Sequence, residues 1–210
     1  MMLRSIIVLM CLAAVGPHWA TAQEPRLVGR LTAETRVQVD AMLDSARARA
    51  LPIEPLVDRA REGASKRASG ERIVAAVRRL TDELQVARDA LGSRSTPSEI
   101  TAGASALRAG ATGDDLAQLR RLRTDRSLTI AAAVLADLVA VGVPADTAVA
   151  AVLALAEFAL DTEYLALREN VERDVALGAS PVSALGVRVE AAAPQGDFGA
   201  GTQRPPARKP

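Results

Sequence analysis

The residue types that most often do chemistry at neutral pH are concentrated at the start of this chain. Cys11, His18 and Trp19 are the only cysteine, histidine and tryptophan in its 210 residues. Imidazole and thiol groups serve as general bases, nucleophiles and ligands for transition metals. Whether the working protein can use them depends on whether this first segment is retained.

The first segment has the pattern of a cleaved export signal. Arg4 precedes the apolar run Ser5–Val15, and the small-residue pattern Ala20-Thr21-Ala22 follows it. The apolar run is too short to cross about 30 Å of hydrocarbon, so a membrane anchor is not expected. We therefore predict that residues 1–22 are a signal peptide and that the protein is exported, to the periplasm or the extracellular medium.

Carboxylates are then the main groups left for chemistry, and three of them share one predicted helix face. Glu54, Asp58 and Glu62 recur at every fourth position. Oxygen ligands on one face could help to hold a hard cation such as calcium, but the loop pattern of calcium sites does not occur in the chain. Ion pairs with Arg59 and Lys66 are the alternative. We expect no metal and no other cofactor.

A single acid and a group of arginines are the other binding candidates. Asp137 lies in the most apolar stretch of the predicted helical region, where an unpaired charge is costly. It could bind a cationic ligand, or pair with an arginine of a neighbouring helix. The basic cluster consists of Arg120, Arg121, Arg123 and Arg126. It could bind an anion or an acidic partner, or simply complement a helix dipole.

No residue is predicted to be catalytic. Lys66 lies beside Ser65 and Ser69, but a lysine that activates a serine must be desolvated, and this one falls in a predicted turn. Tyr164 shares a predicted face with Leu167 and is expected in the core.

The elements that would position these residues are all helices. Turns are predicted where a glycine is followed by a small or apolar residue and then by Ser, Thr or Pro, beginning at Gly63, Gly110, Gly142 and Gly178. Capping boxes are predicted at Thr96–Glu99 and, with aspartate as the acid, at Thr112–Asp115. The predicted helices are 32–50, 54–62, 70–91, 97–109, 113–123, 127–141, 144–158, 162–177 and 181–185.

The fold class follows from the absence of strand patterns. No window shows the sustained alternation of a β-strand. The sequence predicts an all-α fold, either an irregular bundle or a stack of short helical hairpins. The apolar hairpin 127–158 is expected at its centre and not in a membrane, because Asp137 interrupts it and each half is of core-helix length.

The predicted domain organisation is simple. A linker covers 23–31, one helical domain covers 32–187, and a tail rich in proline and glycine covers 188–210. The tail lacks apolar periodicity, so we expect it to be disordered.

One segment resembles a known kind of sequence. In Leu51–Leu80, a Leu-Pro turn opens a short helix that ends in a Glu-Gly pair, and a second helix follows. This segment is similar to one in exported bacterial all-helical proteins of unknown function. The resemblance implies a helical export product and assigns no activity, cofactor or site residue.

Charge and composition narrow the function classes. The chain has 26 basic and 25 acidic residues. Cleavage would remove Arg4, so the number of basic residues would then equal the number of acidic ones. A neutral, exported chain is not expected to bind nucleic acid. We expect a non-enzymatic interaction or structural protein whose partner is another exported or envelope protein. The alternatives are a carrier of a small apolar or amphiphilic ligand between helices, and a hydrolase that uses two carboxylates.

Overall fold

The computed structural model describes residues 24–192, which form helices and contain no β-strand. The predicted all-α fold is confirmed. The predicted signal peptide and the last part of the predicted tail lie outside the described residues. The elements are η1 (a 3-10 helix, Pro25–Leu27), α1 (Ala33–Ala48), α2 (Glu54–Ser65), α3 (Gly70–Leu91), α4 (Pro97–Ala109), α5 (Gly113–Leu122), α6 (Thr129–Ala140), α7 (Ala145–Leu155), α8 (Asp161–Ala176) and α9 (Pro181–Ala192).

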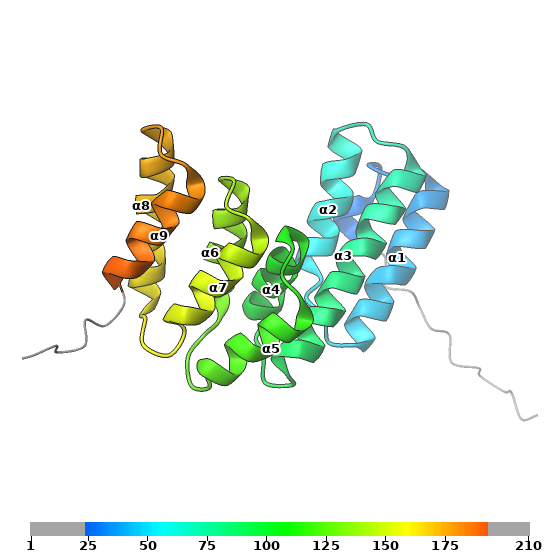
Figure 1. Cartoon of the computed structure of the whole chain (residues 1–210). Helices are drawn as coiled ribbons and strands as arrows, with labels where there is room; N and C mark the ends of the chain where they lie inside the picture. The colour runs from blue at the N-terminus through cyan, green and yellow to red at the C-terminus, as the bar shows by residue number, and fades with distance from the viewer. Residues whose placement is uncertain (1–23, 193–210) are drawn as a thin grey trace, which may run out of the picture.

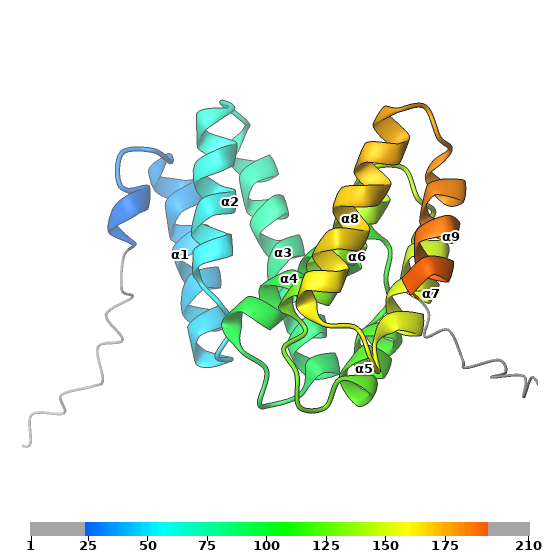
Figure 2. The same cartoon turned by 90° about the vertical axis from the view of Figure 1, so that its left-hand side faces the viewer.

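The helices form four hairpins that stack side by side in chain order, α2/α3, α4/α5, α6/α7 and α8/α9 (Figure 1). In one layer, α4 packs against α6 and α6 packs against α8. In the other layer, α3 packs against α5, α5 against α7, and α7 against α9. Helix α1 packs on α3 at one end of the stack, and α9 lies at the other end (Figure 2).

The same backbone turn ends five of the helices. One residue has a positive φ, and the amide of the next residue donates a hydrogen bond to a carbonyl five positions earlier, as in a Schellman motif. The pairs are Ala50-Leu51, Arg67-Ala68, Gly110-Ala111, Gly142-Val143 and Gly178-Ala179. Three of the four predicted glycine turns are therefore confirmed.

The prediction that Gly63 ends a helix is wrong. Helix α2 continues to Ser65, and Arg67 takes the positive φ instead. Gly63 has another role, because a Cβ atom at this position would lie 2.7 Å from Cγ1 of Ile73 on α3. The missing side chain lets α2 and α3 pack closely.

Both predicted capping boxes are present. The Thr96 hydroxyl accepts from the Glu99 amide at 3.2 Å, and the Glu99 carboxylate accepts from the Thr96 amide at 2.9 Å. Thr112 and Asp115 make the same two hydrogen bonds at 3.2 and 2.8 Å. The first box explains why α4 begins at the predicted residue, and the left-handed Gly110 explains why it ends at the predicted one.

The two ends of the domain differ from the predicted boundaries. Helix α9 continues to Ala192 and not to residue 185, and its Arg188 binds the Asp174 carboxylate with two hydrogen bonds of 2.8 and 2.9 Å. The segment predicted as the linker 23–31 contains η1, whose Leu27 is completely buried. None of the described helices has the length and apolar character needed to cross a membrane.

Candidate functional site

A groove runs between α2 and α4, and α3 forms the floor of its middle and of one of its ends. It consists of three adjoining cavities of about 780, 280 and 300 Å³. The cavities adjoin because they share lining residues: Pro55, Asp58 and Thr101 line the first two, and Arg59, Leu80 and Arg108 line the last two. We call this feature the α2–α4 groove.

The groove exists because the stacking of hairpins is irregular at this point. Helix α4 packs against α3 and α6, and α2 packs against α3. Helices α2 and α4 therefore face each other across the exposed side of α3. Their side chains line the middle cavity from both sides, with Pro55 and Asp58 on α2 and Thr101 and Ser105 on α4.

One end of the groove is apolar and acidic. Three prolines line it, Pro52, Pro55 and Pro97, from the beginnings of α2 and α4. Its charged side chains are Glu54 and Asp58, and no basic side chain lines this cavity.

The other end is basic. The guanidinium groups of Arg59, Arg72, Arg79 and Arg108 come from three helices and line one cavity, in which Glu83 is the single carboxylate. The floor between them is made by Ala75, Ala76 and Leu80 of α3.

Two of the four arginines have partners in the protein. Arg108 donates two hydrogen bonds to Glu83, at 3.1 and 2.6 Å, and Arg59 lies 3.5 Å from the Glu62 carboxylate. Arg72 and Arg79 form no ion pair with any residue between 24 and 192. This end of the groove therefore has unneutralised positive charge.

The three carboxylates predicted on one helix face do lie on α2 beside the groove, but each has a basic partner. Glu54 accepts from Arg26 at 3.0 Å, Asp58 lies 3.5 Å from Arg61, and Glu62 lies 2.6 Å from Lys66. Hydrogen bonds from Arg26 and Lys66 hold the pKa values of Glu54 and Glu62 below their ordinary range. Within residues 24–192, no group of three potential ligands could hold a metal ion.

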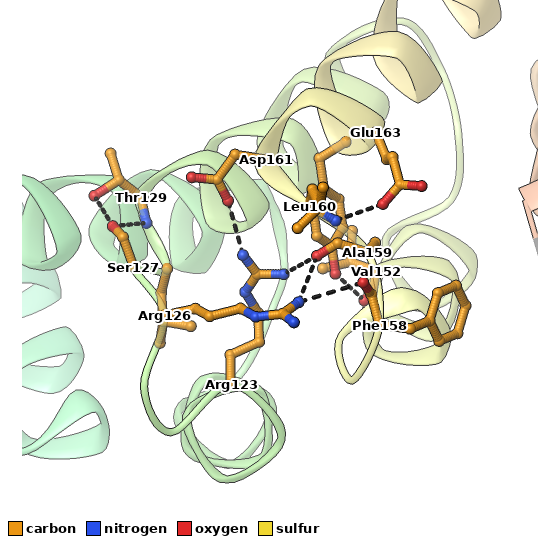
Figure 3. A network of polar contacts seen from close by, with 12 residues as sticks. Arg123, Arg126, Ser127, Thr129, Val152, Phe158, Ala159, Leu160, Asp161 and Glu163 are labelled. Atoms are coloured by element: carbon orange, nitrogen blue, oxygen red, sulfur yellow. Dashed lines mark hydrogen bonds and ion pairs between the residues drawn. The ribbon is translucent and has the colours of Figure 1, made fainter.

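The predicted arginine cluster is only partly brought together: Arg120 and Arg126 line one cavity of about 640 Å³, whereas Arg121 and Arg123 do not line it. Arg123 is 2 % exposed and donates to the Ala159 carbonyl at 2.6 Å and to the Asp161 carboxylate at 2.7 Å (Figure 3). Arg126 also donates to Ala159, at 3.1 Å. These two residues join the loop after α5 to the start of α8.

Arg120 and Arg121 point to different surroundings. Arg120 donates to the buried Glu99 at 2.8 Å, and Glu99 also accepts from the Leu128 amide at 3.0 Å. Burial would raise the pKa of Glu99, but the hydrogen bonds of the Thr96 and Leu128 amides and of Arg120 outweigh it and lower the pKa. Arg121 is exposed.

Asp137 lies on a partly exposed side of α6. Its side chain is 43 % exposed, and its carboxylate accepts a hydrogen bond of 3.3 Å from Arg168 of α8. Its charge is therefore partly in solvent and partly paired, as the second interpretation of this residue expects.

Sequence reasoning missed the basic end of the groove. Arg72 and Arg79 are seven residues apart on α3, with Ala75 and Ala76 between them, so a helix places all four on one side. That signal was available in the sequence. The contributions of Arg59 and Arg108 were not, because they depend on how α2 and α4 pack.

Comparisons with known proteins give no further guidance, since no family model, curated protein or solved structure matches the chain.

Proposed function

We propose that the protein is an exported, non-enzymatic interaction module that binds an extended segment of another exported or envelope protein in the α2–α4 groove. The observation that supports this proposal is the groove itself, which is continuous through three cavities and has different chemistry at its two ends.

The dimensions suit a short peptide segment. The α4 wall extends from Pro97 to Arg108, which corresponds to about 17 Å at 1.5 Å per helical residue. An extended chain at about 3.3 Å per residue covers this length with about five residues. The small side chains of Ala75 and Ala76 would let a peptide backbone approach the floor.

The α4 wall also offers hydrogen-bond acceptors. The hydroxyls of Thr101 and Ser105 donate to carbonyls of their own helix, at 2.8 and 3.2 Å. A hydroxyl oxygen that donates its proton can still accept. Both oxygens could therefore accept hydrogen bonds from the backbone amides of a bound segment.

The charged groups of the groove favour binding over catalysis. A general acid that works near neutral pH needs a raised pKa, whereas those of Glu54 and Glu62 are lowered. Arginine stays protonated in this pH range and is suited to forked contacts with carboxylates.

Peptide selection tests the proposal. A library of random extended peptides would be selected on the full chain, and the enriched peptides measured by fluorescence anisotropy against two variants. Ala75→Trp fills the groove floor, and Ala150→Trp places the same side chain at an exposed site on α7. We expect Ala75→Trp to weaken binding by about tenfold or more and Ala150→Trp to change it by less than about twofold. If no peptide is enriched, or both variants bind as the wild type does, the proposal is wrong.

A further inference from the structure

We infer that the basic cavity at the end of the α2–α4 groove receives an acidic side chain of the bound segment and thereby fixes its orientation. This inference rests on the proposed function and adds the chemistry and the direction of the ligand. We call this cavity the arginine pocket, after the four arginines that line it, Arg59, Arg72, Arg79 and Arg108.

The arginine pocket has an excess of positive charge. It is lined by four guanidinium groups and by one carboxylate, Glu83, which already accepts both of its hydrogen bonds from Arg108. Arg72 and Arg79 pair with no acid among the described residues. Like charges held close together repel, so a carboxylate that enters the pocket reduces this repulsion and forms charge-assisted hydrogen bonds.

The shape of the pocket suits a side chain more than an isolated ion. The cavity is about 300 Å³, and its floor is formed by Ala75, Ala76 and Leu80. An acidic residue has a short apolar stem and a planar carboxylate. Its stem would contact the alanine and leucine side chains while its carboxylate meets the forked guanidinium groups above them.

The opposite end of the groove offers no comparable site for this residue. Glu54 and Asp58 line that cavity, no basic side chain lines it, and both carboxylates already have partners, Arg26 and Arg61. An acidic residue placed there would meet no unpaired guanidinium, so the reversed orientation lacks the attraction that the arginine pocket supplies. This difference between the two ends favours one direction of binding.

A peptide fits this charge distribution better than a nucleic acid does. A polyanion gains affinity from an extended track of basic residues along its backbone. Basic residues line one end and the middle of the groove, and none lines its other end, where Glu54 and Asp58 lie.

Two adjacent arginines of α3 provide a matched test. Both are exposed, but Arg79 lines the pocket whereas Arg78 lines none of the groove cavities. Arg79→Gln and Arg78→Gln remove the same charge from the same helix. The probe is the most enriched peptide of the selection above, labelled with fluorescein, together with its analogue in which glutamine replaces the acidic residue.

We expect enriched peptides to carry Asp or Glu at one end. The amide analogue should bind the full-length wild type about tenfold more weakly, which corresponds to about 1.4 kcal/mol. In Arg79→Gln this preference for the acid should fall to about twofold or less, and in Arg78→Gln it should persist at about tenfold. Far-ultraviolet circular dichroism checks that both variants fold.

The possible failures are distinguishable. Peptides that bind in the groove, as judged by Ala75→Trp, but show no preference for acid over amide would overturn this inference and leave the proposed function intact. Equal loss of the preference in Arg78→Gln and Arg79→Gln would show a general charge effect and would also overturn it. The absence of any groove-dependent peptide would overturn both. Competition by sodium phosphate that exceeds competition by sodium acetate at matched ionic strength would point to a phosphate ligand and against a carboxylate.

Discussion

The guanidinium of Arg123 lies 5.2 Å from the centroid of the Tyr164 ring, which is completely buried. The same guanidinium donates to the Ala159 carbonyl and the Asp161 carboxylate, while the Tyr164 hydroxyl donates to the Val152 carbonyl at 2.8 Å. Burial raises the pKa of Tyr164 to about 12. One arginine therefore holds together the end of α5, the α7–α8 connection and the core of α8.

Replacing Arg123 with methionine should destabilise the fold by about 2–3 kcal/mol, because the Ala159 carbonyl keeps only its hydrogen bond from Arg126, Asp161 loses its partner and the Tyr164 ring loses its cation. Arg123→Lys should recover part of this loss, since it keeps the charge but not the fork. Arg121→Met is the control, and because Arg121 is exposed it should change stability by less than about 0.5 kcal/mol. Urea unfolding followed by circular dichroism measures all three. Equal changes in the free energy of unfolding in Arg123→Met and Arg121→Met would contradict the stabilising role of Arg123.

The lowered pKa of Glu99 predicts how the stability of the fold depends on pH in acid. Its pKa is lower in the folded protein than its ordinary value of 4.5, so its carboxylate stabilises the fold above that pH. This contribution is lost as the pH falls through the lowered pKa of the folded state. Glu99→Gln should therefore cost about 2–3 kcal/mol at neutral pH, and the gap from the wild type should narrow as the pH drops below 4.5.

Unfolding curves at a series of pH values measure this gap. Glu34→Gln on the exposed face of α1 is the control, with an expected effect below about 0.5 kcal/mol at every pH. A gap between wild type and Glu99→Gln that stays constant into acid would show that the carboxylate charge does not matter.

The sequence predicted those parts of the fold that depend on local interactions. The first and last residues of α4 were predicted correctly because Thr96, Pro97 and Glu99 begin the helix and Gly110 ends it. The length of α9 was not, because the long-range pair Arg188–Asp174 supports its last turns. Gly63 was misread as a helix stop for the same reason, since its role is a contact with another helix.

The site was less predictable than the fold. Arg120 and Arg123 are three residues apart, and a continuing helix would place them on one face. Helix α5 ends at Leu122, however, and Arg123 has a non-helical backbone, so the two side chains reach Glu99 and Asp161 respectively. In the arginine pocket, residues that are distant in sequence lie close together in space. Arg59 and Arg108 are far apart in the chain, and only the packing of α2 and α4 beside α3 brings them to one cavity.

Two helix ends carry a left-handed residue that is not glycine, and they offer a stabilising change. Ala50 and Arg67 both have a φ of 53°. A side chain costs about 1–2 kcal/mol in this conformation, and glycine avoids that cost but loses more entropy on folding. Ala50→Gly and Arg67→Gly should each stabilise the fold by a net amount of about 0.5–1 kcal/mol. A lower midpoint of urea unfolding in both variants would contradict this expectation.

The reverse change at two glycines separates backbone strain from a steric clash. Gly178 has a φ of 99°, and a Cβ there would meet nothing within 4 Å, whereas at Gly110, with a φ of 112°, a Cβ would lie 2.8 Å from that of Ala145. Gly178→Ala should cost about 1–2 kcal/mol from strain alone. Gly110→Ala should cost at least about 1 kcal/mol more, because α4 and α7 must move apart. Equal losses of unfolding free energy would show that the Gly110 contact relaxes without cost.

The proposed function requires export, and export makes a prediction about the amino terminus. If residues 1–22 are a signal peptide, protein recovered from the periplasm or the medium should begin at Gln23, as intact mass and amino-terminal sequencing can establish. That form would contain no cysteine, histidine or tryptophan, so it should not react with a maleimide under denaturing conditions. Replacing Ala20 and Ala22 with leucine should block processing and leave the longer form. Exported protein that retains Cys11 would contradict the prediction and restore thiol and imidazole chemistry to the working chain.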